Sequence, residues 1–310
     1  MRAVVLHEFG PPSNLKYENH EDPELNDDEV LVAVTAVSVN PIDWKIRSGS
    51  VQRRMPVNLP IILGRDVAGI VRAVGTSVKD FAAGDRVLSF AMNTYAQLCV
   101  VKAAELARMP EGMEMTQAAA IPLVALTGDQ LLRDATRAQP GQTILLAGAL
   151  GSVGRVAAFA ASEVGAKIIA GVRKDKLDEA RRLPGVMEAV ALDDEASLAK
   201  LGQVDAVANT LMGDITTKLI AKVKEGGIFG SVADMPSNAA QYPAITVNRI
   251  QAKANAKTVA YYAEAVNSGK LELPVERILK LQDAPEAHRL GEKGGVGGKI
   301  VMTVDNENVA

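Results

Sequence analysis

The sequence predicts an α/β protein in which a doubly wound parallel sheet is joined to a mostly β domain. Its 310 residues, 48% of them hydrophobic, can bury a large core and favour two domains over one. The segment before Pro110 is rich in short β-type runs, whereas strand-like and helix-like segments alternate from residue 143 onward. This change along the chain predicts two domains of different architecture.

The first part of the chain carries the Val, Ile and Tyr bias of strands, with Pro, Gly, Asp and Asn between the runs. The predicted strands are residues 29–40, 68–75, 85–90 and 95–101. The long alanine- and leucine-rich segment 116–135 then favours helix over strand.

The middle of the chain alternates between the two kinds of element. Strands are predicted at 143–148, 167–172, 204–210 and 228–233, and helices at 152–165, 174–183 and 214–227. Helical crossovers of this length imply right-handed βαβ units and a parallel sheet. One more helix is predicted at 256–271 and a last strand at 298–304, and the tail 305–310 is expected to be disordered.

A glycine-rich turn follows the first strand of this alternating region. It reads Ala149-Leu150-Gly151-Ser152-Val153-Gly154, with alanine in the place of the first glycine of the pattern G-x-G-x-x-G. Gly151 would let the backbone approach a pyrophosphate, Gly154 would let the helix pack closely on the sheet, and the helix-opening amides would face the phosphate. In this strand–turn–helix context the motif predicts a dinucleotide site of the Rossmann type. A tight turn that binds no ligand is the alternative.

The end of the second strand of this unit indicates which nucleotide binds. An NAD site places Asp or Glu there, whereas this chain has Arg173, with Lys174 and Lys176 nearby. A guanidinium suits the 2′-phosphate of NADP. NADPH is therefore the predicted cofactor, although Asp175 leaves NAD open and the charges also suit an exposed helix start.

Four segments carry a resemblance to a known family: "VSVNPIDWKIRSG" (37–49), "PIILGRDVAGIVRAVG" (60–75), "GDRVLSF" (84–90) and "TYAQLCVV" (94–101). They resemble the zinc-free quinone oxidoreductase, or zeta-crystallin-like, branch of the medium-chain dehydrogenase/reductase superfamily. The resemblance implies a GroES-like catalytic domain formed by 1–120 and completed by 251–310, with a Rossmann domain at 121–250. It also implies a homodimer formed through the edge of the Rossmann sheet.

The places of the zinc ligands are altered relative to the zinc-dependent members of that superfamily. Asn40 stands in place of Cys, and Gly64-Arg65-Asp66 replaces Gly-His-Glu. The single cysteine, Cys99, excludes a four-thiolate zinc site, and none of the three histidines is spaced to form a ligand pair. We therefore predict no metal site.

A zinc-free site of this family is expected to transfer hydride from NADPH to a quinone or to the C=C bond of an α,β-unsaturated carbonyl. The resemblance places Asn40 beside the nicotinamide and substrate, where its amide could donate to the substrate oxygen. Capping of the turn before Pro41 is the alternative role for Asn40. Asp43 is expected to shape the same loop, and Tyr95 is a candidate proton donor, with solvent protonation left open.

Further cofactor contacts are expected from the Rossmann domain. Thr127 matches a family position whose hydroxyl contacts the nicotinamide end. The other candidates end later strands at the crevice of the sheet and are Asn209, Thr210, Ser231 and Val232.

The composition excludes some classes of protein and leaves others open. A net charge of −3 and a pI near 5.8 argue against a nucleic-acid partner. No run is apolar enough for a membrane span, and no secretion-type segment is recognised, so a cytoplasmic protein is expected. A non-catalytic NADPH-binding protein, crystallin-like or RNA-binding, and an alcohol dehydrogenase-type activity remain the alternatives.

Overall fold

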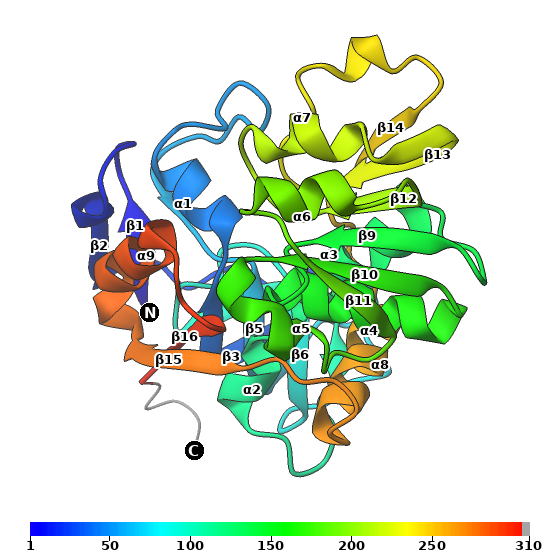
Figure 1. The fold of residues 1–310 in the computed structure, drawn as a ribbon. Coiled ribbons are helices and arrows are strands. Elements are labelled where there is room, and N and C mark those ends of the chain that lie inside the picture. Colours follow the sequence, from blue (N-terminus) through cyan, green and yellow to red (C-terminus); the bar gives the residue numbers. More distant parts are fainter. Residues whose placement is uncertain (306–310) are drawn as a thin grey trace. The chain divides into compact units, whose positions relative to one another are not determined.

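The computed structural model describes residues 1–305, so the tail expected to be disordered lies outside the described residues except for Asp305. The chain divides into two compact units (Figure 1). One, here called the β-rich unit, comprises Met1–Leu123 and the segment from Ala254 onward, and the other, the Rossmann unit, comprises Val124–Lys253. Over the described range, no helix has both the length and the apolar character needed to cross a bilayer.

The β-rich unit contains two sheets and four α-helices. A three-stranded antiparallel sheet has the order β2 (Leu15–Asn19), β1 (Arg2–Leu6), β4 (Ile61–Ile62). The larger sheet has the order β15 (Val275–Lys280), β16 (Lys299–Thr303), β3 (Glu29–Val39), β5 (Asp66–Val74), β6 (Arg86–Phe90), β8 (Ala107–Arg108), and β7 (Leu98–Lys102) also pairs with β3. The helices are α1 (Pro41–Arg47), α2 (Met115–Ala119), α8 (Ala256–Asn267) and α9 (Ala284–Lys293).

Strand β3 is the centre of the larger sheet because it pairs with β5, β7 and β16. The C-terminal return of the chain supplies β16, which runs antiparallel to β3 with Ile300 opposite Val39. In the antiparallel pair of β3 and β5, Ser38 lies opposite Asp66. These registers bring three strand ends together, and the polar side chains at those ends form the cluster described below.

The Rossmann unit is built on one six-stranded sheet whose strands are all parallel. Its order is β11 (Val186–Ala191), β10 (Lys167–Val172), β9 (Thr143–Ala147), β12 (Val204–Asn209), β13 (Val223–Ser231), β14 (Thr246–Arg249). The order reverses between β9 and β12, which confirms the predicted doubly wound sheet and sets a crevice at the carboxyl ends of these two strands. The α-helices that follow the strands are α4 (Ser152–Val164), α5 (Leu177–Ala180), α6 (Glu195–Lys200) and α7 (Ile215–Ile220).

The segment 116–135, predicted to be helical rather than a strand, is helical but not one continuous helix. The segment forms α2, then α3 (Pro122–Gln130), then a π-helical turn η3 (Leu131–Ala135). Pro122 begins α3, where its missing N–H costs nothing, whereas inside a continuous helix it would remove a hydrogen bond and clash with the preceding turn. Alanine propensity alone did not reveal that break.

The helix predicted over 214–227 also differs from the structure. Helix α7 ends at Ile220, and β13 begins at Val223, which pairs with Val204 of β12. Pairing in the parallel sheet therefore outweighs local helix propensity here. Edge strand β11 and helix α6 were not predicted, because their exposed and mixed residues carry a weak periodic signal.

Candidate functional site

The glycine-rich turn connects β9 to α4 at the switch point of the Rossmann sheet. Gly151 is the N-cap residue of α4, with ordinary extended backbone angles (φ −67°, ψ 158°). A Cβ built on Gly151 would meet only the Gly148 carbonyl oxygen, at 3.3 Å. The Gly151 α-carbon therefore borders open space at the start of a 13-residue helix whose first amides have no acceptor within the helix.

The other two glycines of the turn have structural roles. Gly148 has φ +83°, and a Cβ there would lie 2.2 Å from Thr210 Oγ1. A Cβ on Gly154 would lie 2.2 Å from the Gly148 carbonyl oxygen and 2.8 Å from the backbone of Ala149. The motif assigns the tight turn to its first glycine, which corresponds to Ala149, but in this chain Gly148, one residue earlier, makes that turn. Gly154 allows the helix to pack closely.

Arg155 fixes the turn from inside α4. Its Nε donates to the Leu150 carbonyl at 3.2 Å, and its Nη2 donates to Glu179 Oε1 at 2.8 Å. The guanidinium is mostly buried, so it joins the turn to helix α5 in a partly desolvated setting. The sequence analysis did not single out Arg155, because an arginine in an amphipathic helix carries no local signal of a turn contact.

Three basic residues follow the end of β10, as the sequence predicted they would. The side chains of Arg173, Lys174 and Lys176 are 65%, 69% and 45% exposed. Each has a carboxylate neighbour: Arg173 Nε lies 3.5 Å from Asp175, and the two lysines pair with Asp194 and Glu179. Exposed pairs of this kind are weak, so these cations remain available to a phosphate.

The polar residues at the ends of β12 and β13 bind mainly to one another. The Asn209 amide donates to the Leu211 carbonyl at 2.9 Å and to Ser231 Oγ at 3.0 Å. Thr210 Oγ1 donates to the Ala147 carbonyl at 2.8 Å, and the Val232 amide donates to the Asn209 carbonyl. Their side-chain contacts therefore hold the carboxyl ends of β9, β12 and β13 together, and cofactor contacts by Asn209, Ser231 and Val232 stay a prediction.

Thr127 lies partly buried in α3. Its predicted contact with the nicotinamide end likewise stays a prediction.

Asn40 belongs to a buried polar cluster in the β-rich unit. Its Nδ2 donates to Asp66 Oδ2 at 2.8 Å, and its Oδ1 accepts from Lys299 Nζ at 2.6 Å. Ser38 Oγ donates to the same Asp66 oxygen at 2.5 Å, and Lys299 Nζ lies 3.7 Å from it. Because Lys299 can only donate and Asp66 accepts, the orientation of the Asn40 amide is fixed. The second N–H of the Asn40 side-chain amide is only weakly bonded, because its acceptor is Ser38 Oγ at 3.4 Å.

Asp43 and Tyr95 continue this cluster on the other side of Asn40. Asp43 Oδ2 accepts the Asn40 backbone N–H at 2.8 Å and the Tyr95 hydroxyl at 3.1 Å. The bond from the Asn40 backbone N–H to Asp43 belongs to a capping box at the start of α1, in which Pro41 occupies the first helical position. Asn40 is thus the N-cap residue of α1 and its side chain is held by Asp66 and Lys299, and its predicted contact with the substrate stays a prediction.

His288 of α9 lies against Tyr95. Its Nε2 is 3.4 Å from the Tyr95 hydroxyl, and the two rings meet edge to face. Burial raises the pKa of Asp43 to about 7, raises that of Tyr95 well above its ordinary value, and lowers the pKa of His288 to about 3. Tyr95 is fully buried and its hydroxyl donates a hydrogen bond to Asp43, so its predicted role as a proton donor stays a prediction.

These shifts predict opposite pH dependences of stability. Folded Asp43 keeps its proton up to about pH 7, whereas the unfolded chain loses it near 3.8, so the free energy of unfolding falls as pH rises between these values. Folded His288 stays neutral down to about pH 3, whereas the unfolded chain gains a proton below 6.5, so stability falls as pH falls. Between about pH 4 and 6.5 the two contributions oppose each other.

Asp43→Asn should therefore expose the His288 contribution alone. We expect the free energy of unfolding of this variant to decrease by about 1.4 kcal/mol for each unit of pH lost below 6.5, against a flatter wild-type profile. Urea unfolding at several pH values measures this slope. His7→Gln, at an exposed histidine, is the control. Parallel profiles for wild type and Asp43→Asn would contradict the assignment.

Of the positions that match zinc ligands, Asn40 holds an amide, Arg65 a guanidinium, and Asp66 a carboxylate that is already paired with Lys299. Arg65 and Lys299 both act electrostatically on Asp66, and Asn40 Oδ1 is occupied by Lys299. Among residues 1–305 no group of three or more His, Cys, Asp or Glu could hold a metal ion. Guanidinium and ammonium groups cannot ligate zinc and oppose its charge, so this donor set does not fit it.

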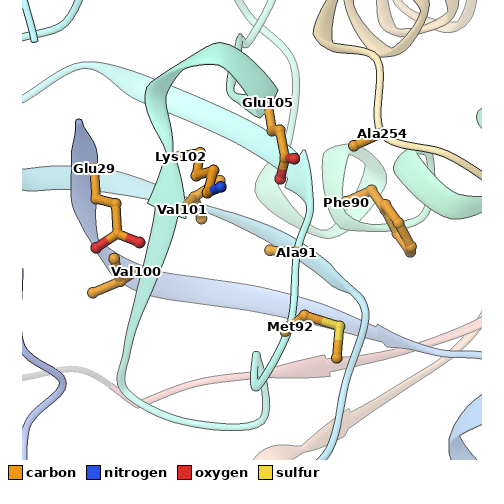
Figure 2. Close-up of a pocket in the computed structure, with 9 residues that line it drawn as sticks. All are labelled: Glu29, Phe90, Ala91, Met92, Val100, Val101, Lys102, Glu105 and Ala254. Carbon is orange, nitrogen blue, oxygen red and sulfur yellow. The ribbon is translucent and has the colours of Figure 1, made fainter. Parts of the chain in front are cut away.

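A pocket of about 440 Å³ lies elsewhere in the β-rich unit (Figure 2). Figure 2 shows the charged groups of Glu29, Lys102 and Glu105 together with apolar side chains such as Phe90. None of the predicted site residues lines it. One wall residue, Met92, also contacts the Arg65 guanidinium through its sulfur.

Comparison with known proteins agrees with this fold. Residues 26–116 match the alcohol dehydrogenase GroES-like domain, and residues 185–302 match the zinc-binding dehydrogenase family. The quinone oxidoreductase structure from Coxiella burnetii is 30% identical, with a TM-score of 0.89 over 98% of this chain and 99% of that one. The chain belongs to the medium-chain dehydrogenase/reductase superfamily, in its quinone oxidoreductase branch, which confirms the predicted family and the GroES-like character of the β-rich unit.

Two further relatives are informative. The Escherichia coli quinone oxidoreductase, solved in complex with NADPH, is 25% identical, with a TM-score of 0.86 over 98% of this chain and all of that one. The mouse synaptic vesicle membrane protein VAT-1 homolog-like is 30% identical over 240 residues, which cover 74% of this chain and 55% of that protein. The chain thus spans about half the length of the curated relatives named quinone oxidoreductase or VAT-1 homolog-like.

Proposed function

We propose that the protein is a zinc-independent, NADPH-dependent reductase that transfers hydride to a quinone or to the C=C bond of an α,β-unsaturated carbonyl. The observation that carries the proposal is the open space at Gly151, at the start of α4 and at the switch point of a parallel sheet. A pyrophosphate requires close backbone approach and free amides, and both are present there. NADPH, once bound, supplies a hydride to an electron-poor carbon.

The residues of this chain have separate roles in the proposal. The turn Ala149–Gly154 holds the pyrophosphate, and Arg173 with Lys174 and Lys176 binds the 2′-phosphate. The weakly bonded amide N–H of Asn40 donates to the substrate oxygen. Lys299 and Asp66 orient that amide, and the contact of Lys299 with its carbonyl oxygen polarises it and strengthens the donor.

An NADPH-consumption assay against a panel of quinones and enones tests the activity. We expect turnover of at least one acceptor class by protein that contains no stoichiometric zinc. Tight NADPH binding without turnover of any acceptor would leave a non-catalytic nucleotide-binding protein. Zinc at one equivalent per chain, measured by metal analysis, would contradict the metal-free proposal.

Preference for NADPH over NADH is predicted to depend on Arg173. Arg173→Gln should weaken NADPH binding about tenfold, since one charge-assisted phosphate contact is lost, and should leave NADH binding unchanged. Fluorescence titration with both nucleotides measures the two affinities. Arg181→Gln, at an exposed arginine paired with Asp178, is the matched control. An equal loss of affinity for NADPH and NADH would show that Arg173 does not contact the 2′-phosphate.

A homodimer through the edge of the Rossmann sheet is part of the proposal. Strand β14 is an edge strand, pairing with β13 on one side of the sheet described here. Edge strands of this kind can pair with a second copy of the chain. Light scattering coupled to size-exclusion chromatography tests the oligomeric state.

A further inference from the structure

Arg65 is a buried cation with almost no hydrogen-bond partner. Arg65 is only 9% exposed, and among the described residues its guanidinium contacts the sulfur of Met92. A thioether is a weak acceptor, whereas a guanidinium carries five N–H donors. No carboxylate of the described chain forms an ion pair with it, although Asp43 and Asp66 act on it electrostatically.

The charges around Arg65 leave it without a full counter-charge. Asp66 is paired with Lys299, at 3.7 Å, and accepts hydrogen bonds from Ser38 and Asn40. Asp43 is the remaining acid, and burial raises its pKa to about 7, so near neutral pH it is only partly ionised. A buried cation in excess over its acids favours an anionic or electron-rich ligand.

Two other buried polar atoms near Arg65 also lack partners within the described chain. Thr94 Oγ1 has none, and it lies against the α-carbon of Gly64, the residue before Arg65. Asp43 Oδ1 also has none. Buried polar atoms are rarely left unsatisfied, so unpaired groups gathered around one guanidinium mark a place for a polar ligand.

Met92 is the side chain that covers this place. It is 48% exposed and also lines the pocket of Figure 2. Methionine is unbranched and flexible, so its displacement by a ligand costs little. The Arg65 donors can therefore be uncovered without moving a strand.

We propose that Arg65 binds the oxyanion that develops on the substrate during reduction. The inference rests on the proposed function. Hydride addition forms a C–H bond at the β-carbon of an enone and breaks the C=C π bond, whose electron pair moves to the carbonyl oxygen as an enolate. NADPH is oxidised to NADP, and a proton from water then completes the α-carbon. Arg65 donates hydrogen bonds to the enolate oxygen and keeps its own protons.

A phenol dye tests this assignment without relying on catalysis. 4-Nitrophenol is a stable mimic of an enolate, and its absorbance reports its ionisation. We expect wild-type protein to lower the apparent pKa of bound 4-nitrophenol, and Arg65→Gln to abolish the shift. Arg65→Lys should retain part of it, since a lysine keeps the charge but not the planar donor set. Arg72→Gln, at an exposed arginine of strand β5, which begins directly after Arg65, is the matched control and should behave as wild type.

Kinetics supply the second measurement. Arg65→Gln should lower kcat/KM for the acceptor about 100-fold while NADPH affinity is unchanged. Thermal unfolding of the variants identifies any loss of fold. A dye shift that is absent in wild type, or retained in Arg65→Gln, would overturn the inference. An Arg65-dependent dye shift in a protein that reduces no acceptor would support the anion site and refute the proposed function.

Discussion

Replacing Gly151 with valine is expected to eliminate NADPH binding with little effect on stability. The Gly151 backbone angles suit any residue, and a Cβ there meets only one oxygen, at 3.3 Å. The expected loss of stability is below about 1 kcal/mol, because valine is a poorer N-cap than glycine. The two methyl groups would nevertheless fill the space that a pyrophosphate needs next to the helix amides.

Fluorescence titration with NADPH and urea unfolding of the same preparation measure both effects of Gly151→Val. Gly202→Val is the matched control, since a Cβ on Gly202 of the same unit meets nothing within 4 Å. Gly154→Val gives the opposite contrast, because its Cβ would collide with turn backbone at 2.2 Å and destabilise the fold. Normal NADPH affinity in Gly151→Val would place the cofactor elsewhere.

Lys299→Met is expected to lower the free energy of unfolding by about 3 kcal/mol, because removing one partner of a buried ion pair leaves the other charge uncompensated. Asp66 is fully buried, and Lys299 is the ammonium within 3.7 Å of its carboxylate. The loss would also release the Asn40 carbonyl, which now accepts from Lys299 at 2.6 Å. The orientation of the Asn40 amide would then be lost together with stability.

A double-mutant cycle separates these effects. Lys299→Met combined with Asp66→Asn removes both charges, and we expect it to regain a large part of the stability lost in Lys299→Met. Lys280→Met, on the adjacent strand β15, removes an exposed ion pair with Asp305 and should change stability by less than about 1 kcal/mol. Additive effects of the Lys299 and Asp66 substitutions in urea unfolding would show that the two residues are not coupled.

Local sequence was sufficient for the Rossmann turn. The strand, the glycine turn and helix α4 are contiguous, so the spacing of Gly151 and Gly154 already indicated which glycine is exposed and which packs closely against the turn backbone. The tight-turn role of Gly148 was missed, since the pattern assigns it to the position of Ala149 and only the positive φ of Gly148 reveals the difference.

The buried cluster could be predicted only in part. Asn40 and Asp43 lie three residues apart in a recognisable loop, and the sequence did identify both. Lys299 contacts Asn40 from 259 residues away in sequence, and His288 contacts Tyr95 from 193 residues away. Such pairs depend on strand pairing and helix packing, and no periodic or spacing rule within one segment contains them.

The position of β16 has a consequence for biosynthesis. The strand is central rather than peripheral, lying between β15 and β3, yet its first residue, Lys299, follows Val39 of β3 by 260 residues in sequence. Until β16 has been synthesised, residues 36–39 of β3 lack their partner on that edge, and Asp66 has no ammonium of Lys299 beside it. The Rossmann sheet, whose strands are contiguous in sequence, can form before β16 is synthesised, whereas the cluster of Asn40, Asp66 and Lys299 can be completed only afterwards.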